Sequence, residues 1–161
     1  MILGLDPGCG TTGIALVENG KLFKHKTMRG EAALIYIANL HTIYKYEKAV
    51  VEKPKQAVFY ARHATKSNAV KSQAGIIKLA QNVGMNMKLT EDLVKKLRSI
   101  GVRTKEVNPK RGTTKWEVGY WTRIFDWQSG RVPSEHARDA SVLAFNWENW
   151  VGWNLPNKYD K

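Results

Sequence analysis

Residues 3–22 read LGLDPGCGTTGIALVENGKL, and this stretch decides the fold. A short apolar run ends on Asp6, a glycine-rich turn follows, and apolar sequence resumes at Gly13. Asn19-Gly20 then separates two further runs, and this dipeptide is the strongest short hairpin signal. The pattern predicts an antiparallel meander of three strands, over residues 2–6, 13–18 and 21–27. It also predicts a carboxylate at the end of the first strand.

The rest of the chain alternates helical periodicity with short buried-type strands. KAVVE at 48–52 follows a predicted helix, so this strand is expected to return in parallel to the sheet. These elements describe an α/β fold, a five-stranded mixed sheet flanked by helices, and 161 residues suit a single domain over 1–161. Helices are predicted at 30–45, 64–83, 90–99 (with Thr90 as N-cap), 114–125 and 134–150, and a fifth strand at 102–107.

Composition favours a nucleic-acid partner. The chain carries 26 basic and 14 acidic side chains, a net charge of +12, with a pI near 9.9. So much positive charge on a small domain is typical of proteins that bind a polyanion. No run reaches the roughly 18 apolar residues of a membrane span, and no basic leader precedes the first strand, so neither a membrane segment nor a signal peptide is expected. Cys9 is the only cysteine, which excludes an internal disulfide and favours a reducing compartment.

Three acids stand at the ends of predicted elements. Asp6 ends the first strand and Glu52 the fourth, while Asp139 lies on the last helix with His136. These two helix residues share a stripe with Leu143, Trp147 and Trp150, which should face the core, so His136 and Asp139 should point inward too. If the two strands are neighbours and the helix packs across them, the three carboxylates converge. Mg²⁺, a hard cation that prefers oxygen ligands, would then compensate their charge, and a pair of ions could support phosphodiester cleavage.

Each acid also has a purely structural interpretation. Asp6 could be a turn residue, since Asp-Pro-Gly is common turn chemistry, and Glu52 could be a solvated strand end. Asp139 could form an ion pair with Arg138 or another neighbour. Glu135 is placed outside the site, as an acid favoured by the dipole of the first helical turn. The coincidence of three such acids favours the functional interpretation.

With these residues identified, the sequence resembles the RuvC family of Holliday junction resolvases, which have the ribonuclease H-like fold. The matching motifs are ILGLDPGCGTTGIALVENG, VVEKP and HARDASVLA, in the family's order over nearly the whole chain. The resemblance implies a metal-binding catalytic set of Asp6, Glu52, His136 and Asp139. It further implies two Mg²⁺ ions per site (with Mn²⁺ able to substitute), a homodimer, four-way or other branched DNA as partner, and a cytoplasmic setting in a bacterial cell or phage-infected host. The Trp-rich tail suits a phage or otherwise divergent member.

Softer matches extend the resemblance. SQAGIIKLA, at 72–80, resembles the family's dimer helix, although its apolar stripe of Val70, Ala74, Ile77 and Ala80 could instead cover the sheet. NPKRGTTKWEVGYW, at 108–121, resembles its basic phosphate-gripping segment. That match implies a catalytic and DNA-binding role for Lys115 and DNA binding by Lys110 and Arg111, against the alternative of a solvated basic loop. DNA contact is also expected from a loop containing Phe59, Tyr60 and Arg62, whose aromatic rings could instead pack on the next helix.

Three other functions remain open. The Asp-Gly hairpin also begins actin-like and sugar-kinase ATPases, which need two such domains around a nucleotide, whereas 161 residues supply one. A catalytically silent DNA-binding module would be expected to have lost an acid, and all three are present. A nuclease of the same fold that acts on flaps, forks or Y-junctions is not separated from a junction resolvase by the sequence.

Overall fold

The computed structural model describes residues 1–8, 10–53, 73–108, 115–128 and 130–147. The elements within these ranges are β1 (Ile2–Pro7), β2 (Thr12–Glu18), β3 (Lys21–Met28), α1 (Gly30–Tyr44), β4 (Lys48–Glu52), α3 (Gln73–Ser99), β5 (Arg103–Val107), α4 (Val118–Ile124) and α5 (Glu135–Phe145). The α/β class and the five predicted strands are confirmed. In the described part of the chain, no helix is long and apolar enough to cross a membrane.

The strands form one mixed sheet in the order β3-β2-β1-β4-β5. The pairs β1–β2 and β2–β3 are antiparallel, and β1–β4 and β4–β5 are parallel, as the hairpin and crossover signals predict. At the β2–β3 turn, Asn19 and Gly20 have φ of 50° and 76°, the left-handed conformation that a two-residue hairpin requires. The sheet thus sets β1 between β2 and β4.

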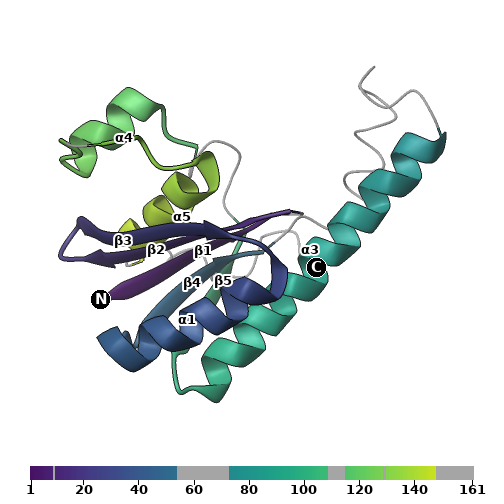
Figure 1. The fold of residues 1–161 in the computed structure, drawn as a ribbon, viewed down its shortest axis with the longest axis horizontal. Coiled ribbons are helices and arrows are strands. Elements are labelled where there is room, and N and C mark those ends of the chain that lie inside the picture. Colours follow the sequence, from purple (N-terminus) through teal and green to yellow (C-terminus); the bar gives the residue numbers. More distant parts are fainter. Residues whose placement is uncertain (9, 54–72, 109–114, 129, 148–161) are drawn as a thin grey trace, which may run out of the picture.

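Helices cover both faces of this sheet (Figure 1). On one face, α1 and the C-terminal part of α3 pack over the main core, in which Leu3 and Leu5 of β1 meet Ile37 of α1 and Leu93 of α3. On the other face, α5 lies across β1 and β2, and α4 rests on its outer side. The layers are therefore α1 and α3, the sheet, α5, and finally α4.

Two glycines let α5 lie directly on the sheet. A Cβ built on Gly4 of β1 would lie 1.8 Å from the carbonyl oxygen of Ala140, and one on Gly13 of β2 would lie 1.9 Å from that of His136. Both distances are far below any tolerated contact, so only glycine fits at these positions. The strand predicted over residues 13–18 already includes Gly13, and the missing side chain of Gly13 within β2 serves helix packing.

The prediction of two separate helices, at 64–83 and 90–99, is wrong, because Gln73–Ser99 is one continuous helix. Thr90 is therefore not an N-cap: it is buried in the helix, and its hydroxyl donates to the Asn86 carbonyl at 2.8 Å. This i−4 bond satisfies the hydroxyl without ending the helix. Of the first predicted helix, residues 64–72 lie outside the described ranges.

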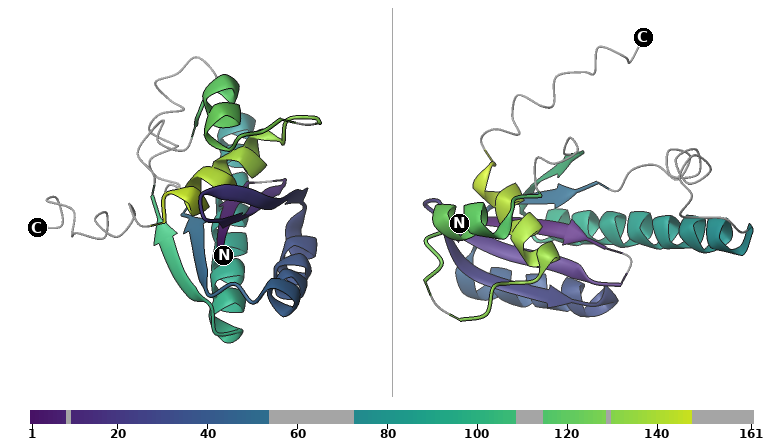
Figure 2. Two further views of the ribbon diagram at one scale, coloured as in Figure 1. Left: turned by 90° about the vertical axis from the view of Figure 1, so that its left-hand side faces the viewer. Right: turned by 90° about the horizontal axis from the view of Figure 1, so that it is seen from above.

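The N-terminal half of α3 projects beyond the edge of the sheet (Figure 2). Ala74, Ile77 and Ala80 are exposed on it, so this part of the predicted stripe does not cover the sheet; Val70 lies outside the described residues. Ile77 is 51% exposed and Met85, two turns further on, is 61% exposed. Among the described residues, α3 thus presents an exposed apolar surface.

Both later helices are shorter than expected. Helix α4 begins at Val118 rather than 114, because Lys115 and Trp116 lie outside the helix and direct their side chains to α5. Helix α5 begins at Glu135, after the N-cap Ser134, and ends at Phe145, where the side chain of Asn146 donates to the Val142 carbonyl. Residues 148–150 of that predicted helix lie outside the described ranges.

Candidate functional site

The site lies at the carboxyl ends of β1 and β4. The last paired residues of these parallel strands are Leu5 and Val51, so Asp6 and Glu52 follow them side by side on the sheet. Both lie on the α5 face, because side chains two residues apart share a face and Gly4 contacts α5 directly. Asp6 is only 7% exposed, and Glu52 is partly buried. Asp6 is therefore a strand residue held against a helix rather than a turn residue.

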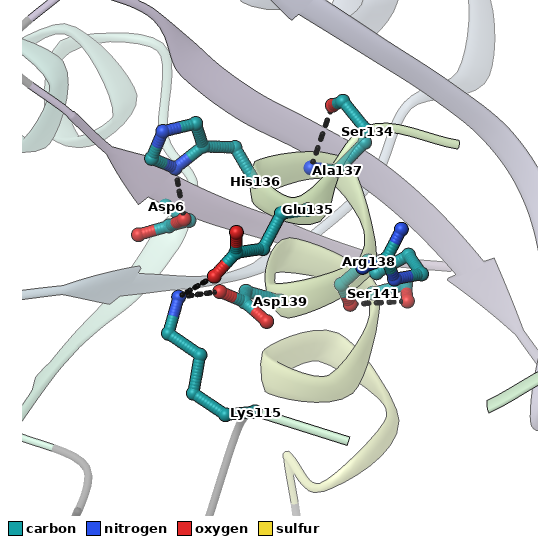
Figure 3. A network of polar contacts seen from close by, with 9 residues as sticks. All are labelled: Asp6, Lys115, Ser134, Glu135, His136, Ala137, Arg138, Asp139 and Ser141. Atoms are coloured by element: carbon teal, nitrogen blue, oxygen red, sulfur yellow. Dashed lines mark hydrogen bonds and ion pairs between the residues drawn. The ribbon is translucent and has the colours of Figure 1, made fainter. Parts of the chain in front are cut away.

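Helix α5 brings His136 and Asp139 to the same edge (Figure 3). Its first turn is fixed by Ser134, whose hydroxyl accepts from the amide of Ala137 and contacts Thr27 of β3. The Nδ1 atom of His136 lies 2.6 Å from Oδ2 of Asp6, which joins α5 to β1. Asp139, one turn further along, is 2% exposed. The inward orientation predicted for these two residues is confirmed.

Lys115 brings a cation to this site. Its ammonium group donates to Oε1 of Glu135 at 2.9 Å and to Oδ2 of Asp139. Its position is set by the adjoining α4, whose buried Trp121 donates from Nε1 to the hydroxyl of Ser141 at 2.8 Å and so anchors α4 on α5. The ion pair that the structural interpretation allowed for Asp139 is therefore present, but with Lys115 rather than Arg138, whose guanidinium donates to the Pro133 carbonyl.

These contacts and the burial shift several pKa values. Burial raises the pKa of Asp139 to about 6, although the bond from Lys115 opposes the shift. The hydrogen bond to Asp6 raises the pKa of His136 against the effect of its partial burial. Burial lowers the pKa of Lys115, but its bonds to Asp139 and Glu135 outweigh this and raise it overall. Lys115 is therefore a permanent cation beside a carboxylate that is costly to ionise.

The residues at this edge suit a hard divalent cation by chemistry. Asp6, Glu52 and Asp139 offer carboxylate oxygens, the donors that Mg²⁺ prefers, and the burial of Asp139 creates a need for positive charge that Lys115 now meets. As the side chains stand, however, no group of three or more His, Cys, Asp or Glu residues in the described ranges is close enough to hold an ion. Asp6 is bonded to His136 and Asp139 to Lys115, so a metal ion would have to exchange with these partners.

The raised pKa of Asp139 has a measurable consequence for stability. A carboxyl whose folded pKa is about 6, against 3.8 ordinarily, binds its proton more tightly when folded, so stability falls as pH rises from 4 to above 6. Asp139→Asn removes this cost and should raise the free energy of unfolding by about 3 kcal/mol at pH 8, in chelator, with a smaller gain at pH 5. Urea unfolding at the two pH values measures both gains.

The exposed Asp126, changed in the same way to Asn, is the matched control and should leave the free energy of unfolding unaltered at both pH values. An Asp139→Asn protein less stable than the original at pH 8 would contradict the burial argument. That result would mean that the ion pair with Lys115 outweighs the desolvation of Asp139.

The described residues include only part of the predicted site. It brings Asp6, His136, Asp139 and Lys115 together and sets Glu52 beside Asp6 on the sheet. Glu135, which was placed outside the site, contacts Lys115 directly. Its spacing of four residues before Asp139 on a helix was the available signal. Outside the described residues lie Cys9, Phe59, Tyr60, Arg62, Lys110 and Arg111.

The fold defined by this sheet and its helices is the ribonuclease H-like fold of the junction resolvases. RuvC of Thermus thermophilus bound to a Holliday junction substrate superimposes with a TM-score of 0.61 at 14% identity, over 95% of both chains. A second T. thermophilus RuvC structure gives 0.56 at 13% identity, over 94% of this chain and 95% of that one. Fowlpox virus resolvase with Holliday junction DNA gives 0.54 at 14% identity, over 92% and 99%. No protein-family model and no curated protein sequence matches the chain.

Proposed function

We propose that residues 1–161 form one nuclease domain that cuts branched DNA, with the four-way Holliday junction as its substrate. The observation that carries this proposal is the meeting of Asp6, His136, Asp139 and Lys115 at one sheet edge, beside Glu52, on a fold shared with junction resolvases. The net charge of +12 suits a DNA partner. The neighbours bound to Holliday junction DNA favour that substrate among branched DNAs.

Mg²⁺, with Mn²⁺ as a substitute, is the proposed cofactor, two ions per site. Asp6, Glu52 and Asp139 would hold the ions through carboxylate oxygens, and His136 would add a nitrogen ligand. When bound, such ions supply an activated water and charge stabilisation at the phosphate being cut. The proposed ligands match the donor atoms at this edge of the sheet. Metal binding would require the Lys115 ammonium to leave Asp139.

Two side chains have further proposed roles. Lys115, once released from Asp139, would pair with a phosphate oxygen of the substrate, because its ammonium lies at the site and stays charged at neutral pH. The Nδ1 atom of His136 faces Asp6. When the neutral ring donates a hydrogen bond from Nδ1, its Nε2 carries the lone pair and would accept a proton or a metal ion. Asp6 would then orient the imidazole whichever role it performs.

A cleavage assay on four substrates tests the function. Purified protein is given a synthetic four-way junction, a 5′ flap, a Y-junction and linear duplex, each with Mg²⁺, with Mn²⁺ or with chelator. We expect cleavage of the junction at least tenfold faster than of the other DNAs, and none in chelator. Preferred cutting of flaps or Y-junctions would assign the other branched-DNA activity, and binding without cutting in either metal would identify a silent binding module.

We also propose that the protein acts as a homodimer through the exposed part of α3. A four-way junction is nearly two-fold symmetric, and two cuts are needed to resolve it, so two sites related by a two-fold axis suit the substrate. Ala74, Ile77 and Ala80 offer small and apolar side chains on the projecting half of the helix, and Met85 extends the surface. Lys78 beside them is exposed, where the edge of a dimer would meet DNA.

Ile77→Asp should convert the dimer to a folded monomer near 18.2 kDa, because a charge cannot be buried at an apolar interface without a partner. Ile35→Asp is the matched control, since Ile35 is 64% exposed on α1, away from the proposed interface. Light scattering measures the mass, and the junction assay should show unpaired nicks for Ile77→Asp only. A native protein that remains a monomer on the junction yet makes paired nicks would overturn the dimer proposal.

A further inference from the structure

Glu135 is an acid of this site to which the proposed metal-binding set gives no role. Its Oε1 atom accepts from the Lys115 ammonium at 2.9 Å, and the same ammonium also donates to Asp139 (Figure 3). Glu135 and Asp139 are four residues apart on α5, so successive turns of one helix present both carboxylates to one cation. The side chain of Asp139 is 3% exposed and that of Glu135 is 65% exposed. Lys115 thus has one buried and one solvent-exposed partner.

Helix α5 does not need the contact between Glu135 and Lys115. Glu135 is the first residue of the helix, where a carboxylate interacts favourably with the helix dipole, and the N-cap bond is made by Ser134. The dipole alone would leave the carboxylate free to point into solvent. Glu135 instead meets Lys115, from a segment 20 positions away in the sequence, and the hydrogen bond from that ammonium lowers the pKa of Glu135. The contact therefore matters for the placement of Lys115.

Metal binding would leave Lys115 in need of a second partner. Asp139 is a proposed ligand, so its bond to Lys115 has to break when it binds an ion. The ammonium then stands beside another cation, which repels it, and the long lysine side chain gains rotamer entropy by moving into solvent. Glu135 opposes both effects, because its carboxylate already bonds the ammonium and stays outside the proposed ligand set. Lys115 can therefore leave Asp139 without leaving the site.

We propose that Glu135 is a positioning residue, which keeps the Lys115 ammonium at the catalytic edge of the sheet after Asp139 has turned to a metal ion. Held there, the ammonium pairs with a phosphate oxygen of the DNA, as charged hydrogen bonds favour. Glu135 touches neither DNA nor metal in this role and acts only through Lys115. This inference rests on the proposed function in taking Asp139 as a metal ligand and branched DNA as the substrate.

The variant Glu135→Gln tests this role, because two opposite effects on DNA binding compete in it. By charge alone, the substitution removes a repulsion toward phosphates and should tighten binding. Loss of a correctly held Lys115 should weaken it. Affinity for a labelled four-way junction is measured in chelator, where Asp139 still holds Lys115, and in Ca²⁺, a hard cation that takes carboxylate oxygens. Binding is read at times when a denaturing gel shows uncut DNA.

Relative to the unchanged protein, we expect Glu135→Gln to bind up to threefold more tightly in chelator and at least threefold more weakly in Ca²⁺. The matched control is Glu117→Gln, which removes the same charge at an exposed position two residues after Lys115. It should bind slightly more tightly in both conditions. Equal tightening by Glu135→Gln in chelator and in Ca²⁺ would overturn the proposal. Circular dichroism checks that both variants are folded.

A double-mutant cycle shows whether Glu135 acts through Lys115. Single-turnover cleavage in Mg²⁺ should be at least tenfold slower for Glu135→Gln and for Lys115→Gln, and the double variant should match Lys115→Gln within twofold. A further loss in the double variant would give Glu135 a role of its own, as a ligand or in the helix, and would overturn the proposal. An unchanged protein that never cuts in Mg²⁺ or Mn²⁺ refutes the nuclease function, whereas the opposite effects on binding in chelator and Ca²⁺ would still support the role of Glu135.

Discussion

Asp6→Asn should abolish DNA cleavage, with a rate at least roughly a thousandfold below that of the unchanged protein. The substitution replaces an anionic oxygen at a buried strand end by a neutral amide of nearly the same size, so a proposed metal ligand is lost while packing is kept. Loss of a metal-based interaction costs several kcal/mol of transition-state stabilisation, and each 1.36 kcal/mol is a factor of ten in rate. Junction binding in chelator should change less than threefold. Single-turnover cleavage of a labelled junction in Mg²⁺ measures the rate.

Asp126→Asn is the control, because it makes the same chemical change at an exposed turn. It should cut at the rate of the unchanged protein. If Asp6→Asn also cuts at that rate, Asp6 is no metal ligand, and the hydrogen bond to His136 is then its only assigned role.

Gly13→Ala should lower the free energy of unfolding by about 3 kcal/mol or more. A Cβ at this position would lie 1.9 Å from the carbonyl oxygen of His136 and 2.8 Å from the amide nitrogen of Ala137, so the backbone of α5 has to move. The movement occurs at the turn that carries His136. The variant should therefore cleave less, even at temperatures where it is fully folded. Urea unfolding gives the free energy.

Gly119→Ala is the matched control for this prediction. Gly119 lies in α4 with no heavy atom within 4 Å of a built Cβ, so the added methyl group meets open space. Since alanine is the better helix former, this variant should gain about 0.5–1 kcal/mol. A Gly13→Ala protein as stable as Gly119→Ala would show that α5 does not lie against β2 as described.

Local signals in the sequence were enough to predict the sheet. Short apolar runs and the Asn19-Gly20 turn specify β1, β2 and β3, because backbone preferences act between neighbouring residues. The helix between β3 and β4 required a crossover, which made β4 parallel. The same logic failed in α3, where Thr90 followed by Glu91 and Asp92 imitates the start of a helix although the helix is continuous.

The sequence predicted which acids form the candidate site, but it did not predict the contacts that these acids make. Asp6 and Glu52 could be predicted as neighbours because both end strands, and the helical stripe placed Asp139 inward. The bonds that Lys115 makes to Glu135 and Asp139 depend on how α4 packs on α5 through Trp121 and Ser141, which no local pattern contains.

The sequence by itself determined the signals for strands and turns, the positions of the acids along the chain and the positive net charge of the protein. All three follow from residue types and short spacings. Only the tertiary structure decided why Gly4 and Gly13 must be glycine, and which partner each charged group holds. The physical reason is the separation of the contacting residues: Asp6 and His136 are 130 positions apart, so their contact exists only once α5 has packed on the sheet. That packing depends on the missing side chains at Gly4 and Gly13.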